Sequence, residues 1–183
     1  MVCPPPSPDG LGETRRMERP QWWLELGGVV VLVGLGLATG LDRRILAASD
    51  EATLALVPAI LVVAAIHEAC HYLASRALGF DPVVDVVPPR VYAPGQWGTR
   101  REAMVALLAP VAVVTVIGLV AWAAPLGPTA ALLGHAAVVL NLAMAGGDLY
   151  AAGVVARLPA GSRTIVIETD DGPVEFVAEP MRR

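Results

Sequence analysis

The sequence contains no lysine, and all 13 of its basic residues are arginines. With 17 acidic residues the formal net charge is −4 at pH 7. No basic stripe is present that could replace the counterions around nucleic-acid phosphates. The composition therefore excludes nucleic acid as an expected partner.

Cysteine is also scarce. The two cysteines are Cys3, in a proline-rich N-terminal stretch, and Cys70, inside an apolar run. One pair placed in such different surroundings does not make a disulfide framework. The fold must therefore be held by burial of apolar side chains.

Charged residues make up only 16% of the chain, whereas 55% is hydrophobic and the mean hydropathy is +0.60. Soluble domains are about 45–50% apolar even when glycine is counted. The excess indicates an all-α membrane protein, with the lipid bilayer as a partner.

About 20 apolar residues are needed for a helix to cross the hydrocarbon. Four segments are that long, and they predict four transmembrane helices over residues 22–41, 52–78, 103–124 and 129–155. Together they form a predicted transmembrane domain over residues 21–158.

The segments outside these helices differ in character. Residues 1–20 are polar and proline-rich, which predicts a disordered tail. Residues 80–98 combine prolines with β-branched residues and predict a short cytoplasmic strand and loop insertion. In the tail 159–183, apolar and polar residues alternate on both sides of Asp171 and Gly172, which predicts a β-hairpin.

The arginines predict the orientation, because cytoplasmic loops hold the positive excess. With the N-terminus inside, only Arg43 and Arg44 of the 13 arginines lie outside. We therefore expect a multi-pass protein of the plasma membrane with both termini in the cytoplasm.

One motif carries chemistry. Residues 67–71 read HEACH, an HExxH motif, and on a helix His67 and His71 lie one turn apart on the same face. Both imidazoles can then bind one Zn²⁺, with Glu68 placed to take a proton from the zinc-bound water. HExxH also occurs by chance, but here it interrupts a fully apolar run, where ionisable groups are costly and usually functional.

A catalytic zinc usually takes three protein ligands. Asp148 is the best candidate for the third, because it is the other acidic residue deep in an apolar segment. The second and fourth predicted helices both run from outside to inside, which places HExxH and Asp148 at similar depth. Asp85, in the proline-rich insertion, is a weaker alternative.

Other residues of the fourth apolar segment have more than one possible role. Asn141 lies seven residues before Asp148 and could bind a substrate backbone or bridge helices. Gly146 and Gly147 could allow close helix approach or a bend that aims Asp148. For His135, in the outer half of the fourth segment, a structural role is favoured.

HEACH, the segment RREAMVALLAP and the N-x6-D pattern ending in GGDLY together resemble the putative zincin peptidases, which are related to the site-2 intramembrane proteases. The resemblance covers roughly residues 66–177. It implies that His67, His71 and Asp148 hold Zn²⁺ and that Glu68 is the general base.

The favoured hypothesis is an intramembrane zinc metalloprotease that cleaves membrane-protein or peptide substrates, held in extended form at an edge strand near Phe80. The alternative is a non-catalytic metal-binding membrane protein, such as a transporter or scaffold. A metallohydrolase acting on lipids or other amides is a third possibility. Glu68 favours hydrolysis, because metal binding alone would need only the two histidines.

Overall fold

The computed structural model describes residues 4–17, 21–86, 89–169 and 172–181, and the side chains of residues 21–25 lie outside this description, as does Cys3. The chain divides into two compact units. A mixed unit comprises Met1–Pro20, His71–Leu108 and Tyr150–Arg183, and a helical unit comprises Gln21–Cys70 and Ala109–Leu149.

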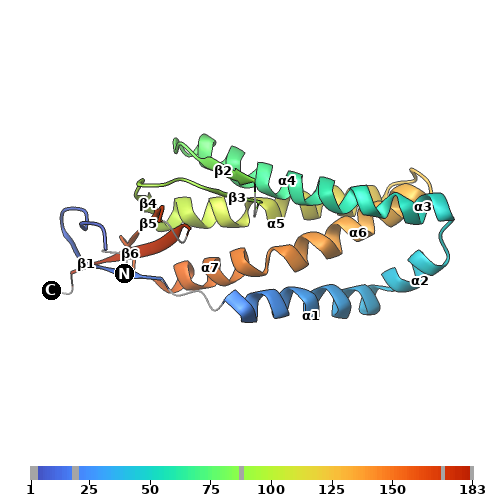
Figure 1. Cartoon of the computed structure of the whole chain (residues 1–183), viewed down its shortest axis with the longest axis horizontal. Helices are drawn as coiled ribbons and strands as arrows, with labels where there is room; N and C mark the ends of the chain where they lie inside the picture. Colours follow the sequence, from blue (N-terminus) through green and yellow to red (C-terminus); the bar gives the residue numbers. More distant parts are fainter. Residues whose placement is uncertain (1–3, 18–20, 87–88, 170–171, 182–183) are drawn as a thin grey trace. The chain divides into compact units, whose positions relative to one another are not determined.

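The described residues are mostly helical, as predicted (Figure 1). The helices are α1 (Gln21–Thr39), α2 (Leu41–Leu46), α3 (Asp50–Leu54), α4 (Leu56–Ala77), α5 (Arg100–Ala123), α6 (Pro128–Met144) and α7 (Gly146–Arg157).

Two stretches are long and apolar enough to cross a membrane: Asp50–Ala77, which comprises α3 and α4, and Arg100–Ala123, which is α5. The bent pair of α6 and α7 makes a third if it counts as one span. The described apolar part of α1, Leu26–Thr39, is shorter than a full span. The chain therefore has the features of a membrane protein, and the count of four crossings remains a prediction.

In the helical unit, α1 lies beside α6 (Figure 1). Leu41, Leu132 and Val139 are buried in a cluster that joins these helices to α2. Small residues permit the close packing. A Cβ at Gly28 of α1 would lie 2.8 Å from the carbonyl oxygen of Ala143.

Helices α5 and α6 approach each other even more closely. A Cβ added to Gly134 of α6 would lie 2.5 Å from the backbone nitrogen of Trp122 and 2.7 Å from the carbonyl oxygen of Gly118. Any side chain at Gly134 would therefore push the two backbones apart.

The helix predicted over 129–155 is broken in the structure. The segment forms two helices, α6 and α7, which meet at Ala145 at an angle of 52°. Gly146 and Gly147 follow the break directly, and glycine stabilises a continuous helix least among residues other than proline. A Cβ at Gly147 would meet nothing within 4 Å. Of the two roles considered for the glycine pair, the bend is the one that Gly147 fits.

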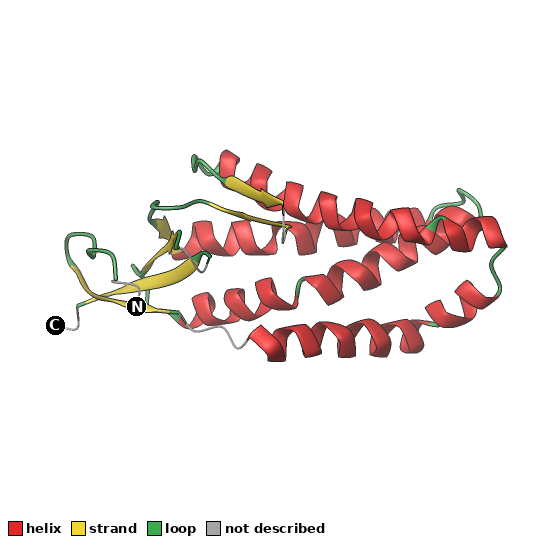
Figure 2. Ribbon diagram, viewed as in Figure 1, coloured by secondary structure: helices red, strands yellow, loops and turns green. Residues whose placement is uncertain are grey.

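The mixed unit contains a small antiparallel sheet, whose strands are yellow in Figure 2. It has four strands in the order β1-β6-β5-β4. Its strands are β1 (Leu11–Arg16), β4 (Gly98–Thr99), β5 (Arg163–Ile167) and β6 (Val174–Pro180). Strands β5 and β6 pair from Arg163 opposite Ala178 to Ile167 opposite Val174, so the predicted C-terminal hairpin is present. Phe176 is 1% exposed and packs with Ile165 and Val174 beneath the sheet.

The prediction of disorder was wrong for residues 11–16. This segment is strand β1, in which Thr14, Arg15 and Arg16 lie opposite Ala178, Val177 and Phe176 of β6. The segment has too few apolar residues to form structure alone, but the edge of β6 supplies the backbone partners.

The insertion between α4 and α5 is extended, as predicted, but it forms two paired strands where the sequence predicted a strand and a loop. Strands β2 (Val83–Val86) and β3 (Pro89–Tyr92) form a separate two-stranded antiparallel sheet. Helix α5 then begins with a capping box: Glu102 accepts a bond from the Thr99 backbone N–H at 2.7 Å, and the Thr99 hydroxyl accepts one from the Glu102 N–H at 3.2 Å.

Candidate metal centre

The two motif histidines lie on helix α4, as the sequence predicts. His67 is 3% exposed, and His71 follows one helical turn later, half-buried. Residues four apart in a helix share a face. Both rings are therefore available to one site.

Asp148 is the third residue of α7, in its first turn. The bend at Ala145 creates this helix start. Backbone N–H groups at a helix N-terminus carry partial positive charge and favour a carboxylate there. The break between α6 and α7 thus provides a place where an aspartate can stay ionised in an apolar segment.

Asn141 determines where the His67 ring carries its proton. The Asn141 amide nitrogen donates to the carbonyl of Pro110 at 3.3 Å and to the hydroxyl of Thr115 at 3.1 Å. This turns the amide oxygen toward Nδ1 of His67, at 2.9 Å. An amide oxygen can only accept, so Nδ1 carries the proton and the lone pair of the neutral ring lies on Nε2.

Nε2 of His67 lies 3.1 Å from Oδ2 of Asp148. The two side chains are only 4% and 16% exposed. A ring lone pair and a carboxylate oxygen repel each other at this distance unless a cation lies near both. The arrangement therefore suits either a shared proton or a metal ion.

The His71 ring is held in the same tautomer as the His67 ring. Its Nδ1 lies 2.9 Å from the backbone carbonyl oxygen of Ala106. A carbonyl has no proton to give, so Nδ1 of His71 donates and the lone pair of the neutral ring again lies on Nε2.

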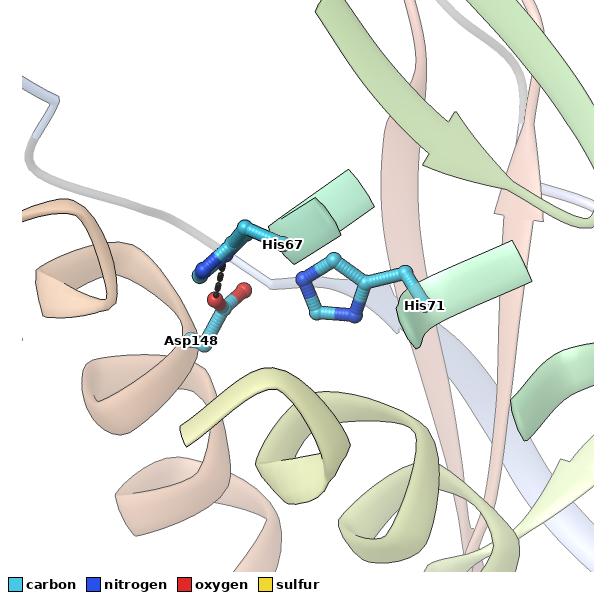
Figure 3. A group of neighbouring side chains, drawn as sticks. All are labelled: His67, His71 and Asp148. Carbon is cyan, nitrogen blue, oxygen red and sulfur yellow. Dashed lines mark hydrogen bonds and ion pairs between the residues drawn. The ribbon is translucent and has the colours of Figure 1, made fainter. Parts of the chain in front are cut away.

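His67, His71 and Asp148 form a group in which one possible ligand atom from each residue lies within 4.8 Å of the others (Figure 3). The His71 ring points toward Asp148 in this view, and His67 contacts the carboxylate. In a tetrahedral zinc site with bonds of about 2.1 Å, ligand atoms lie about 3.4 Å apart. Two imidazole nitrogens and a carboxylate oxygen are also a ligand set that zinc accepts. These residues therefore fit a zinc ion.

A comparison with known families places this geometry in context. The sequence model of the putative zincin peptidase family matches residues 60–163, more than half of the 183 residues. The chain belongs to the putative zincin peptidase family. No curated protein matches it, and neither does any solved structure.

Membership of the zincin peptidase family indicates a metallopeptidase and implies zinc as its metal. The matched region contains the whole of the possible metal-binding group. The HEACH motif supplies Glu68, which is half-buried on α4 beside His67.

Asn141 of this zincin peptidase family member has no exposed surface. Of the two roles left open by the sequence, bridging helices is the one its hydrogen bonds perform, since they join α4, α5 and α6. A substrate backbone would find no accessible amide there.

The remaining candidates lie elsewhere. His135 is fully buried, bonds to the Thr39 hydroxyl at 2.6 Å and stacks on Trp122 with ring centres 4.0 Å apart. Asp85 accepts a bond from Nε of Arg90 across the β2–β3 pair at 2.9 Å. Neither belongs to the metal-binding group found among the described residues.

Sequence reasoning missed two supporting groups. Ala106 contributes only its backbone carbonyl, which no side-chain pattern reveals. Thr115 is a single hydroxyl in the apolar run of α5, and that isolation was the available signal, because a buried hydroxyl needs a partner.

Proposed function

We propose that this protein is an intramembrane zinc metallopeptidase that hydrolyses peptide bonds of membrane-associated substrates. His67, His71 and Asp148 are its zinc ligands, and Glu68 is the general base. The observation that carries the proposal is the tautomer of the two histidine rings. Each ring has an acceptor at Nδ1, so in each neutral ring the lone pair lies on Nε2, the atom that would bind a cation together with the Asp148 carboxylate.

A zinc ion held by these residues would act as a Lewis acid and lower the pKa of a water molecule. The protein's own residues supply the rest. Glu68, adjacent to His67 on α4, accepts a proton from the attacking water and delivers it to the leaving amine. Asn141 and the Ala106 carbonyl hold the two rings in the orientation that ligation needs.

We further propose that the β2–β3 hairpin holds the substrate in extended form. Within the described residues each of its strands pairs with only one neighbour, which leaves backbone groups for an added strand. Val83, Val84 and Val86 expose 39%, 54% and 79% of their surface and offer apolar contacts.

The base of this hairpin is held by side chains. Desolvation, followed by the carboxylates of Asp85 and Glu168, raises the pKa of Tyr92. A tyrosine is protonated at neutral pH even without this shift, and the Tyr92 phenol donates to Glu168, just beyond β5.

The test compares wild type with Glu68→Gln, which keeps the side-chain size and removes the base. Both proteins are purified and their bound zinc is measured, and membrane proteins are profiled in cells that carry each. We expect zinc in both and cleavage products only with wild type. Zinc in both with identical profiles would favour the non-catalytic metal-binding alternative, and the absence of zinc from both would refute the site.

A further inference from the structure

Helix α5 carries a proline in its interior. Pro110 lies within Arg100–Ala123 and is less than 2% exposed. In an α-helix each N–H bonds to the carbonyl four residues earlier, and proline has no N–H. Pro110 therefore leaves the carbonyl of Ala106 without its usual helical partner.

This same carbonyl accepts the hydrogen bond from Nδ1 of His71, at 2.9 Å. Ala106 is half-buried, so its carbonyl needs a partner where water does not reach it, and His71 provides one. Without the proline, the N–H of residue 110 would compete with His71 for the Ala106 oxygen.

The backbone of residue 110 also serves the other histidine, although this contribution does not require a proline. Its own carbonyl accepts from the Asn141 amide at 3.3 Å, which helps turn the Asn141 oxygen toward His67. One turn of α5 thus supplies an acceptor directly to His71 and, through Asn141, orients the partner of His67.

We propose that Pro110 is a positioning residue of the metal centre: by freeing the Ala106 carbonyl it fixes the proton of His71 on Nδ1 and directs Nε2 to the metal. The role in metal binding rests on the proposed function, in which His71 is a ligand. A proline that only bends a membrane helix would have no effect on the tautomer of a histidine.

The experiment uses Pro110→Ala in the full-length protein, with Pro128→Ala as the matched control. Pro128 is the first residue of α6, where a missing N–H costs no helical bond. The chain has three histidines, so ¹⁵N NMR of labelled imidazoles can identify the tautomer of each in metal-free protein at a pH where the rings are neutral. Zinc affinity is measured in parallel.

In wild type and Pro128→Ala we expect His71 to carry its proton on Nδ1. In Pro110→Ala we expect a mixture of tautomers and zinc affinity about 10- to 100-fold weaker, the usual effect of losing a partner of a metal ligand. Removing a proline from a helix interior should not unfold the protein.

Two results would overturn the proposal: a wild-type His71 with its proton on Nε2, or a Pro110→Ala protein with unchanged tautomer and unchanged zinc affinity. The first needs no variant at all. A wild-type protein that shows the expected tautomers but does not bind zinc would refute the proposed function and leave the effect of Pro110 on His71 intact.

Discussion

Asp148 is the residue on which the metal centre depends most. Replacement by asparagine keeps the shape and places an N–H donor opposite Nε2 of His67. We expect Asp148→Asn to stay folded and to lose zinc affinity by at least about a hundredfold, beyond the loss seen for partners of ligands. Metal analysis after equilibrium dialysis measures this.

His135→Phe is the control for that variant. It keeps a ring stacked on Trp122 and alters a histidine outside the metal-binding group. Its zinc content should match that of wild type. Equal zinc in wild type and Asp148→Asn would show that the aspartate is not a ligand.

Asn141 should affect zinc affinity through its hydrogen bond to His67. Asn141→Leu keeps the volume but removes the acceptor for Nδ1 and the amide that donates to the Thr115 hydroxyl and the Pro110 carbonyl. We expect zinc affinity to fall about 10- to 100-fold and stability to fall by about 1–3 kcal/mol. Zinc titration and thermal unfolding in detergent measure the two effects; undiminished affinity would mean that His67 does not need this partner.

Sequence reasoning went furthest for side chains whose chemistry is costly in an apolar segment. His67, His71 and Asp148 stand out because charge and polarity at membrane depth need a reason, and the structure brings the three together. The contributions of Pro110 and Ala106 could not be predicted in this way. They arise from a missing backbone N–H and a carbonyl oxygen, and these become visible only when the helices are packed.

At the level of helices, two glycines of the same segment should respond in opposite ways to alanine. Gly134→Ala would place a Cβ 2.5 Å from the Trp122 nitrogen, whereas the corresponding atom at Gly147 would meet nothing within 4 Å. We expect Gly134→Ala to destabilise the protein by about 1–3 kcal/mol and Gly147→Ala to be neutral or stabilising by up to about 1 kcal/mol. Thermal unfolding of both variants in one detergent tests this; equal losses would contradict the packing described for α5 and α6.

The β2–β3 hairpin offers a test of substrate binding. Along β2 successive N–H groups alternate between the partner strand and the open edge, so one of Val83→Pro and Val84→Pro breaks the pair and the other blocks the edge. We expect both to reduce cleavage while zinc content stays unchanged. Val84→Thr, which keeps the N–H, is the control and should cleave normally. Full cleavage by both proline variants would exclude strand addition at β2.

The helical pattern alone could not reveal that α6 and α7 are separate. Apolar residues continue through Ala145, so the pattern predicts one helix over 129–155. The bend lies beside two glycines, which have low helix propensity, and an aspartate that is stabilised at a helix N-terminus. The strand at residues 11–16 was missed for a related reason, since its partner β6 lies at the other end of the chain.

For the whole molecule, the strands that share one sheet constrain the number of times the chain crosses the membrane. Strands β1, β4 and β5 belong to one sheet, and a sheet lies on one side of a bilayer. Between β1 and β4 the chain passes through α1 and the span Asp50–Ala77, and between β4 and β5 through α5 and the α6–α7 pair. An even number of crossings is needed in each interval.

We therefore predict that α1 and the α6–α7 pair both cross, which gives four spans with both termini on one side. Single cysteines at Ser7, Ser49, Gln96 and Gly127, in a chain whose two native cysteines are replaced by serine, can be labelled with an impermeant reagent from each side of the membrane. Positions 7 and 96 should react from the cytoplasmic side, and 49 and 127 from the outside. Labelling of 7 and 96 from opposite sides would refute the topology.

The pairing of β1 with β6 also has a consequence for synthesis. Among the described strands β1 is made first and its partner β6 last, so β6 must leave the ribosome before these two strands can meet. Until then β1 presents its backbone groups unpaired, and a contact between such distant residues forms slowly. We expect protease resistance near residues 11–16 to appear only after β6 has left the ribosome, and limited proteolysis of stalled chains of different lengths measures this.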